Sequence, residues 1–349
     1  VGGLVLLLAL LIGQLTTAQA SIWRDTSAPA ARAGETLDRV IVPDQARVVA
    51  ADIAALDAIL ASAPHEDDVP VTQSPVQLQL PMPDGSFMSF RIVESPIMHP
   101  DLAARYPEIK TYLAQGIDDP IMRGRFDRTP NGFHAMISTS RDEIYIDPYS
   151  RDDIAFYNVY FANDFQRSSA QILPQLPPEI LREAGQAGVS QRSDVTASRS
   201  GTTRSDYSLA LATTGEYSTF HGGTKPLVMS ELTTAINRVN EIYERDLAVR
   251  LFFVANNDDL IYLNGATDPY TNSSGGAMLS ENQITIDAVI GVDQYDVGHV
   301  FSTGGGGIAT LASVCWTNFA ARGVTGLPNP VGDPFYIDFV AHELGHQFG

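Results

Sequence analysis

The residues whose types and spacing point most clearly to chemistry are 342–349, which read His-Glu-Leu-Gly-His-Gln-Phe-Gly. If this segment is helical, His342 and His346 lie on one face with Cβ atoms roughly 6 Å apart, because residues four positions apart are neighbours on a helix. That separation lets both imidazoles reach one metal ion, and histidine nitrogens are common ligands of zinc. Glu343, directly after the first histidine, is the candidate general base. The alternative is a surface helix with two solvated histidines and a solvated glutamate.

An amphipathic pattern favours the metal site over the surface helix. Asp333 and Pro334 offer an N-cap followed by a proline in the first turn, where the missing N–H costs nothing. From there, at about 100° per residue, apolar side chains gather on the side opposite to His342 and His346. These apolar positions are Ile337, Val340, Leu344 and Phe348. One face of the predicted helix therefore packs against the protein core, and the other presents the two histidines to a metal ion.

The segment matches the first eight positions of H-E-x-x-H-x-x-G-x-x-H, the metzincin metalloprotease signature. Over residues 205–349 the sequence resembles the bacterial reprolysin-like (adamalysin-type) peptidases, and the stretches that carry this likeness are 215–223, 237–246, 298–304 and 329–334. The resemblance implies an α/β (α+β) metzincin-type catalytic domain with a mixed, mostly parallel sheet and an active-site helix. It also implies one catalytic Zn²⁺ held by His342 and His346, Glu343 as general base, and a protein or peptide substrate.

In that family the glycine at the position of Gly349 breaks the helix, and a histidine three positions further on is the third zinc ligand. We expect this third ligand and the Met-turn of the family to follow residue 349, so that residues 1–349 alone are an inactive fragment. A gluzincin-type hydrolase, with a glutamate ligand much farther downstream, is an alternative that Gly349 disfavours. A non-catalytic secreted binding module of the same fold is a second alternative, which the intact Glu343 disfavours.

The other end of the sequence has the character of an export signal. Residues 4–12 form an unbroken apolar run, and Ala18-Gln-Ala20 offers a small-x-small cleavage site. We therefore expect residues 1–20 to be an N-terminally clipped signal peptide and the protein to be secreted and extracellular. A membrane anchor is the alternative, but the apolar run is short for a bilayer. No membrane segment is expected in the mature chain.

Composition fits an exported globular protein. The chain has 349 residues and a net charge of −19, from 22 basic and 41 acidic side chains. This charge argues against nucleic acid as a partner, because phosphates would be repelled. Cys315 is the single cysteine, and we expect its partner beyond residue 349, with a buried free thiol as the alternative. No oligomeric state is predicted.

The chain divides at residues 183–206, a Ser/Thr/Gly/Arg-rich stretch that is typical of a linker. Its arginines make it a candidate site for proteolytic release of a β-rich propeptide, residues 21–182, from a catalytic domain, residues 207–349. In the propeptide we predict a helix over 46–62, a hairpin of 76–80 with 87–93, and strands over 132–138, 143–146 and 154–160. His99 and His134 are expected to be packing histidines.

In the catalytic region the elements alternate as a mixed α/β sheet requires. We predict strands over 207–212, 247–254 and 297–303, a long helix opening at Pro226, and a shorter helix over 282–289. The four glycines 304–307 lack the features of a phosphate loop. The resemblance implies that the edge strand on which a peptide substrate lies follows them, and a flexible turn is the alternative. Asp258, Asp259 and Asp268 are candidate ligands for Ca²⁺, although such acids are most often turn formers.

Overall fold

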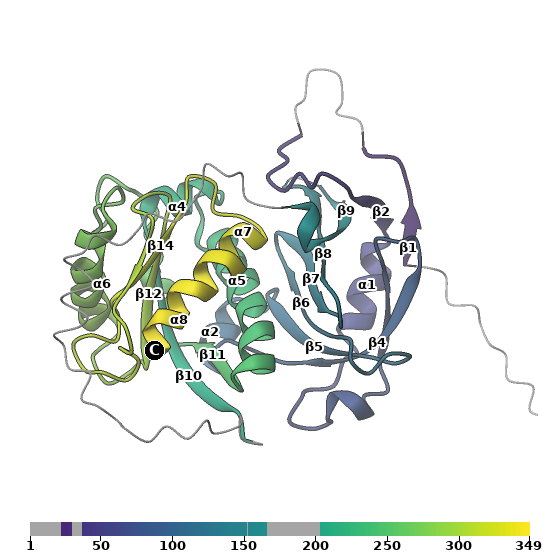
Figure 1. Cartoon of the computed structure of the whole chain (residues 1–349), viewed down its shortest axis with the longest axis horizontal. Helices are drawn as coiled ribbons and strands as arrows, with labels where there is room; N and C mark the ends of the chain where they lie inside the picture. The colour runs from purple at the N-terminus through teal and green to yellow at the C-terminus, as the bar shows by residue number, and fades with distance from the viewer. Residues whose placement is uncertain (1–21, 30–36, 152, 166–202) are drawn as a thin grey trace, which may run out of the picture.

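The computed structural model describes residues 22–29, 37–151, 153–165 and 203–349, which form two sheets with their helices (Figure 1). We call residues 22–165 the N-terminal unit and residues 203–349 the C-terminal unit. The predicted signal peptide and nearly all of the predicted linker lie outside the described residues. Within the described residues, no helix combines the length and the apolar character that a membrane crossing needs.

The N-terminal unit is built on a nine-stranded sheet whose neighbouring strands are all antiparallel, in the order β1-β2-β9-β8-β7-β6-β5-β4-β3. The predicted hairpin and the three predicted strands are confirmed as β3 with β4, and as β7, β8 and β9. The strands are β1 Trp23–Asp25, β2 Arg47–Ala51, β3 Gln77–Pro81, β4 Phe87–Glu94, β5 Lys110–Gly116, β6 Arg123–Thr129, β7 Gly132–Ser138, β8 Glu143–Ser150 and β9 Asp153–Phe161. The helical pieces are α1 Ile53–Leu60, η1 Val71–Gln73, α2 Pro100–Arg105 and η2 Ala162–Asp164.

The helix predicted over residues 46–62 is wrong in its first part, because Arg47–Ala51 is strand β2. Val48 and Val49 are β-branched residues that suit a strand, and β2 pairs with β1 on one side and β9 on the other. Helix α1 starts only after Asp52, whose carboxylate accepts a hydrogen bond from the backbone N–H of Ala55 at 3.0 Å. Sheet pairing therefore overrides the helical periodicity up to the N-cap.

The C-terminal unit carries a five-stranded sheet in the order β11-β10-β12-β14-β13, with three parallel pairings and one antiparallel pairing. This confirms the mixed α/β class. The strands are β10 Ser205–Thr213, β11 Val249–Phe253, β12 Val297–Ser302, β13 Gly307–Ala309 and β14 Gly323–Gly326. The helices are α4 Gly215–Phe220, α5 Lys225–Asp246, η4 Asn257–Leu260, α6 Gly275–Val289, α7 Asp333–Phe335, the π-helical segment η5 Tyr336–Ala341, and α8 His342–Phe348. Strand β10 begins at Ser205, two residues earlier than predicted and inside the predicted linker, and α6 begins seven residues before the predicted 282.

Side chains of β10 alternate between two cores, and this alternation defines the layers. Leu209 and Leu211 belong to a core shared with α5 and the helix that ends in α8, whereas Ala210 and Ala212 belong to a core shared with α6. Helix α5 therefore covers one face of the five-stranded sheet and α6 the other. Figure 1 shows α5 standing between the five-stranded sheet and the N-terminal sheet. Helix α5 is buried nearly all round, with its apolar side on the C-terminal core.

The helix that carries the signature starts differently from the prediction. Its N-cap is Gly332, and Asp333 is the first helical residue rather than the cap. The carboxylate of Asp333 instead accepts a hydrogen bond from the Tyr145 hydroxyl of β8 at 2.5 Å. The six residues before His342 are π-helical, a conformation that is rare and is often found at functional sites. Val340 and Leu344 are fully buried, as the predicted apolar face requires.

Candidate metal centre

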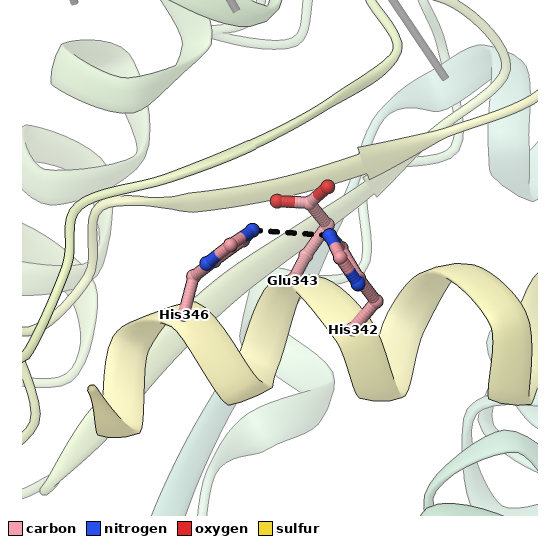
Figure 2. Close-up of side chains that lie close together, drawn as sticks. All are labelled: His342, Glu343 and His346. Atoms are coloured by element: carbon pink, nitrogen blue, oxygen red, sulfur yellow. Dashed lines mark hydrogen bonds between the residues drawn. The ribbon is translucent and has the colours of Figure 1, made fainter. Parts of the chain in front are cut away.

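Three potential metal ligands converge on α8 (Figure 2). The Nε2 atoms of His342 and His346 are 3.0 Å apart, and the two rings are nearly perpendicular, at 85°. The potential ligand atoms of His342, Glu343 and His346 all lie within 4.8 Å of one another. No other such group of His, Cys, Asp and Glu is found within the described residues. The three residues singled out by their spacing in the sequence therefore lie together in the structure.

Glu343 differs from the two histidines because it is buried, with 4% of its surface exposed. Burial raises the pKa of its carboxyl to about 8, and no described cationic side chain lies close enough to oppose this shift. The backbone of Gly307 packs directly against the carboxylate: a Cβ added at Gly307 would come within 2.2 Å of Oε1. The lack of a side chain at Gly307 therefore leaves the space that the Glu343 carboxylate occupies.

The donor set fits a zinc ion. Both imidazoles present Nε2 to the same point, and the pKa of His346 is lowered, first by burial and then by the neighbouring His342, which favours the neutral form that binds metals. A buried carboxylate beside two basic nitrogens is costly without a positive charge nearby. A divalent cation held by the two histidines would supply that charge.

A buried polar network ties α8 to the sheet. The Gln347 side-chain amide donates to the carbonyl oxygens of Gly298 and Ala320, so its Oε1 is free to accept from His299 Nδ1 at 2.7 Å. His299 must then carry its proton on Nδ1, and its Nε2 accepts from the Thr325 hydroxyl at 2.8 Å. Burial lowers the pKa of His299 to about 4, which keeps the ring neutral. Gln347, which directly follows His346, is thereby held against β12, and through His299 it is linked to β14.

Backbone contacts fix the same helix at two further points. The Tyr243 hydroxyl of α5 donates to the carbonyl oxygen of Ala341, the residue before the first histidine, at 2.7 Å. At the other end, the backbone N–H of Ala312 donates to the carbonyl oxygen of His346 at 2.9 Å. These bonds hold the carbonyl group directly before His342 and that of His346 itself, so the orientation of the site depends on α5 and on the loop after β13.

Other predicted positions have different roles. His134 is buried and pairs with Asp127 at 2.8 Å, as expected of a packing histidine, whereas His99 caps α2. Among the candidate calcium ligands, Asp258 accepts hydrogen bonds from Arg105 and Tyr106 through its carboxylate. Asp268 accepts from the backbone N–H of Gly215 and that of Tyr270.

Cys315 and strand β13 were both considered in the sequence, and the structure shows the surroundings of each. Cys315 is exposed, which removes the alternative of a buried thiol, and its partner beyond residue 349 stays a prediction. Residues 307–309 form β13, an edge strand paired with β14 alone. The contributions of Gln347, Tyr243 and Gly307 were not predicted, because each depends on a contact between segments far apart in the sequence.

Comparison with known proteins gives the class of this region. Residues 229–349, about a third of the chain, match the family model described as Metallo-peptidase family M12B Reprolysin-like. The likeness predicted from the sequence is therefore confirmed over this segment, which includes α5 from Met229 onward, the edge strand and the ligand cluster. No curated protein matches the chain.

Among solved structures, the chain is similar to metalloproteinase-II from Bacteroides fragilis. The identity is 13%, the match covers 83% of this chain and 86% of that one, and the TM-score is 0.37.

Proposed function

We propose that the protein is a zinc-dependent endopeptidase, made as a secreted precursor in which residues 21–182 are a propeptide. The observation that carries the proposal is the convergence of His342 and His346 on one point beside a buried Glu343, within a reprolysin-like segment. The apolar run at residues 4–12 and the Ala18-Gln-Ala20 site support secretion.

In this proposal His342 and His346 hold the zinc, and a third histidine, three positions after Gly349, completes the ligand set. Zinc, when bound, activates water and polarises the carbonyl of the scissile peptide bond. The protein's own contribution is the placement of Glu343. Its carboxylate accepts a proton from the attacking water and then donates that proton to the leaving amine.

The peptide substrate is proposed to lie along β13. This strand is at the edge of the sheet, so its outer backbone groups are open to pairing with an extended chain. Gly307, at the start of β13, adjoins the Glu343 carboxylate. A peptide paired with β13 would therefore pass beside the general base.

The test is Glu343→Gln in the protein extended past Gly349 to include the third histidine. We expect peptide hydrolysis to fall by at least about 100-fold with zinc still bound, because Glu343 is assigned proton transfer and not coordination. Asp293→Asn, at an exposed acid of the same unit, is the matched control and should hydrolyse normally. Near-normal turnover by Glu343→Gln would refute the proposed role.

A further inference from the structure

The connection between β4 and β5 leaves its own sheet and enters the core of the other unit. Ile97, Met98, Leu102, Tyr106 and Ile109 are all buried, and they belong to the same core cluster as α5, β10, β11 and the active-site helix. The separate core of the N-terminal sheet contains none of them. Residues 97–109 are therefore a part of the N-terminal unit that completes the C-terminal core.

The same segment closes an edge of the five-stranded sheet. Strand β11 is an outer strand of that sheet, and an open edge invites pairing with other chains. The backbone N–H of Phe253 donates to the Ile97 carbonyl at 2.8 Å, and the N–H of His99 donates to the Phe253 carbonyl at 3.0 Å. Arg105 of α2 adds an ion pair with Asp258 at 2.7 Å.

A buried ion pair joins the units at a second place. Arg238 of α5 is almost fully buried, and its guanidinium pairs with Asp147 of β8 at 2.5 Å. Asp147 is equally buried and also accepts from the Tyr160 hydroxyl at 2.6 Å. Among the described ion pairs, Arg238 has no other carboxylate, so its charge is balanced from the N-terminal unit. Removing one partner of such a pair leaves an uncompensated buried charge.

A chain of buried charges crosses the boundary at a third place. Arg125 of β6 pairs with Glu244 of α5 at 2.6 Å, Glu244 also pairs with Arg250 of β11, and Arg250 pairs with Glu66 at 2.5 Å. If the two units separated, Arg125 and Glu66 would each lose their ion-pair partner, whereas Glu244 and Arg250 would keep each other. The two ends of the chain, Arg125 and Glu66, belong to the N-terminal unit, and the middle pair, Glu244 and Arg250, belongs to the C-terminal unit.

We propose that the N-terminal unit remains non-covalently bound to the peptidase as a permanent subunit after the chain is cut between residues 183 and 206. Three kinds of contact hold it: residues 97–109 in the core, the strand pairing with β11, and the buried ion pairs at Arg238 and Arg125. Among the described hydrogen bonds and ion pairs, none joins the N-terminal unit to His342, Glu343 or His346. This unit can therefore remain without occupying the ligand cluster. The inference goes beyond the proposed function and does not depend on the role of Glu343.

The test uses the full chain with a recognition sequence for a site-specific protease inserted between residues 183 and 206. After complete cutting, the two parts should co-elute on size exclusion at 0.15 M and at 1 M NaCl, because buried ion pairs are screened far less than exposed ones. Separate elution of two folded parts at 0.15 M NaCl would overturn the proposal.

Variants then identify the contact that holds the parts together. The C-terminal part is immobilised, and the N-terminal part that washes off after cutting is measured over time. Asp147→Asn should speed its release by roughly 30-fold or more, because removing one charge of a buried pair leaves Arg238 unpaired and acts mainly on the dissociation rate. Adding Arg238→Met should restore much of the slow release, because both charges are then gone. Asp84→Asn, at an exposed turn of the N-terminal unit, is the control.

Leu102→Ala provides a second probe that leaves the charges in place and shortens one buried side chain of the inserted segment. It should also speed release relative to the control. Circular dichroism of the uncut variants verifies that each is folded. If Asp147→Asn and Leu102→Ala both release the N-terminal part at the control rate, the interface described here does not hold the subunit.

Discussion

The two sheets of this protein are organised in different ways, and only one of them supports the candidate site. The N-terminal sheet is antiparallel throughout, and most of its strands follow one another through short connections. In the five-stranded sheet, the parallel neighbours require crossover connections, which place α5 on one face and α6 on the other. The active-site helix packs beside α5 on the same face. Long crossovers thus bring distant residues to one point, which short hairpins do not.

The units also differ in what they bury. The N-terminal core is aromatic and aliphatic, with Trp23, Phe126, Phe133 and Tyr157 in mutual ring contacts. The boundary between the units buries paired charges in addition to apolar side chains, which are those of residues 97–109 and a small cluster around Tyr145, Tyr160 and Val331. Apolar cores make each unit compact, whereas paired charges fix how the two units fit together, since a pair tolerates little displacement.

The largest expected effect is at glycines where an added Cβ would clash with neighbouring atoms, and one such glycine in each unit tests the comparison. Gly307→Ala should lower kcat/KM by about 100-fold, because its Cβ would meet Glu343 Oε1 and the Phe339 ring, and a shift of about 1 Å at a catalytic group can cost that much. Gly124→Ala in β6 is also crowded, with the Met136 carbonyl oxygen at 2.4 Å, and should lower the melting temperature without changing the kcat/KM of folded protein.

The control for both is Gly276→Ala on α6, where an added Cβ would meet nothing within 4 Å. It should leave activity and stability nearly unchanged. Equal loss of activity in Gly124→Ala and Gly307→Ala would mean that the N-terminal sheet contributes to catalysis, which contradicts the contrast drawn here.

The second prediction concerns the boundary. Glu244→Ala should lower the free energy of unfolding by about 3–5 kcal/mol, because it removes the carboxylate that pairs with buried Arg125. Glu108→Ala, at an exposed acid of the N-terminal unit, should change it by less than about 0.5 kcal/mol. Chemical denaturation of both variants measures the difference, and similar values would show that the boundary charges are not needed for stability.

The third prediction is a pH dependence within the C-terminal unit. Burial lowers the pKa of His299 to about 4, below its ordinary value of 6.5, so the unfolded chain binds more protons between these values. This residue's contribution is fully present above pH 6.5 and is lost as the pH falls towards 4, by an amount on the order of 3 kcal/mol. His299→Gln cannot titrate, so its free energy of unfolding should fall less between pH 7.5 and 4.5 than that of the unmodified protein. If the free energies of unfolding of both proteins fell equally with pH, His299 would be more exposed to solvent than described here and its pKa would not be lowered.

Some of this arrangement could be predicted from the sequence. The ligand pair, the long helix at Pro226, and the strands at 132–138 and 297–303 follow from local spacing and periodicity, which a single segment carries. The first half of 46–62 was predicted as helix and is strand, because its partners in β1 and β9 are remote in the sequence. The N-cap at Gly332 was missed because Asp333 bonds to Tyr145, 188 residues earlier.

The features that position the site were the least predictable. His299 reaches Gln347 from another strand, and Gly307 is informative only because Glu343 lies against it. His299 has no local pattern that distinguishes it, and the four-glycine run 304–307 does not show which glycine meets the carboxylate. The predicted domain boundaries, the secretion signal and the roles of the three site residues stay predictions.

The zinc content of the protein tests the central claim most directly. The protein, extended past Gly349 to include the third histidine, is dialysed against metal-free buffer, and its zinc is measured per chain together with that of His342→Ala, His346→Ala and Glu343→Gln. The account predicts about one zinc per chain in the unmodified protein and in Glu343→Gln, and a large loss in both histidine variants, because each removes one of the three protein ligands of a tetrahedral site. Full retention of zinc by His342→Ala and His346→Ala would contradict the account.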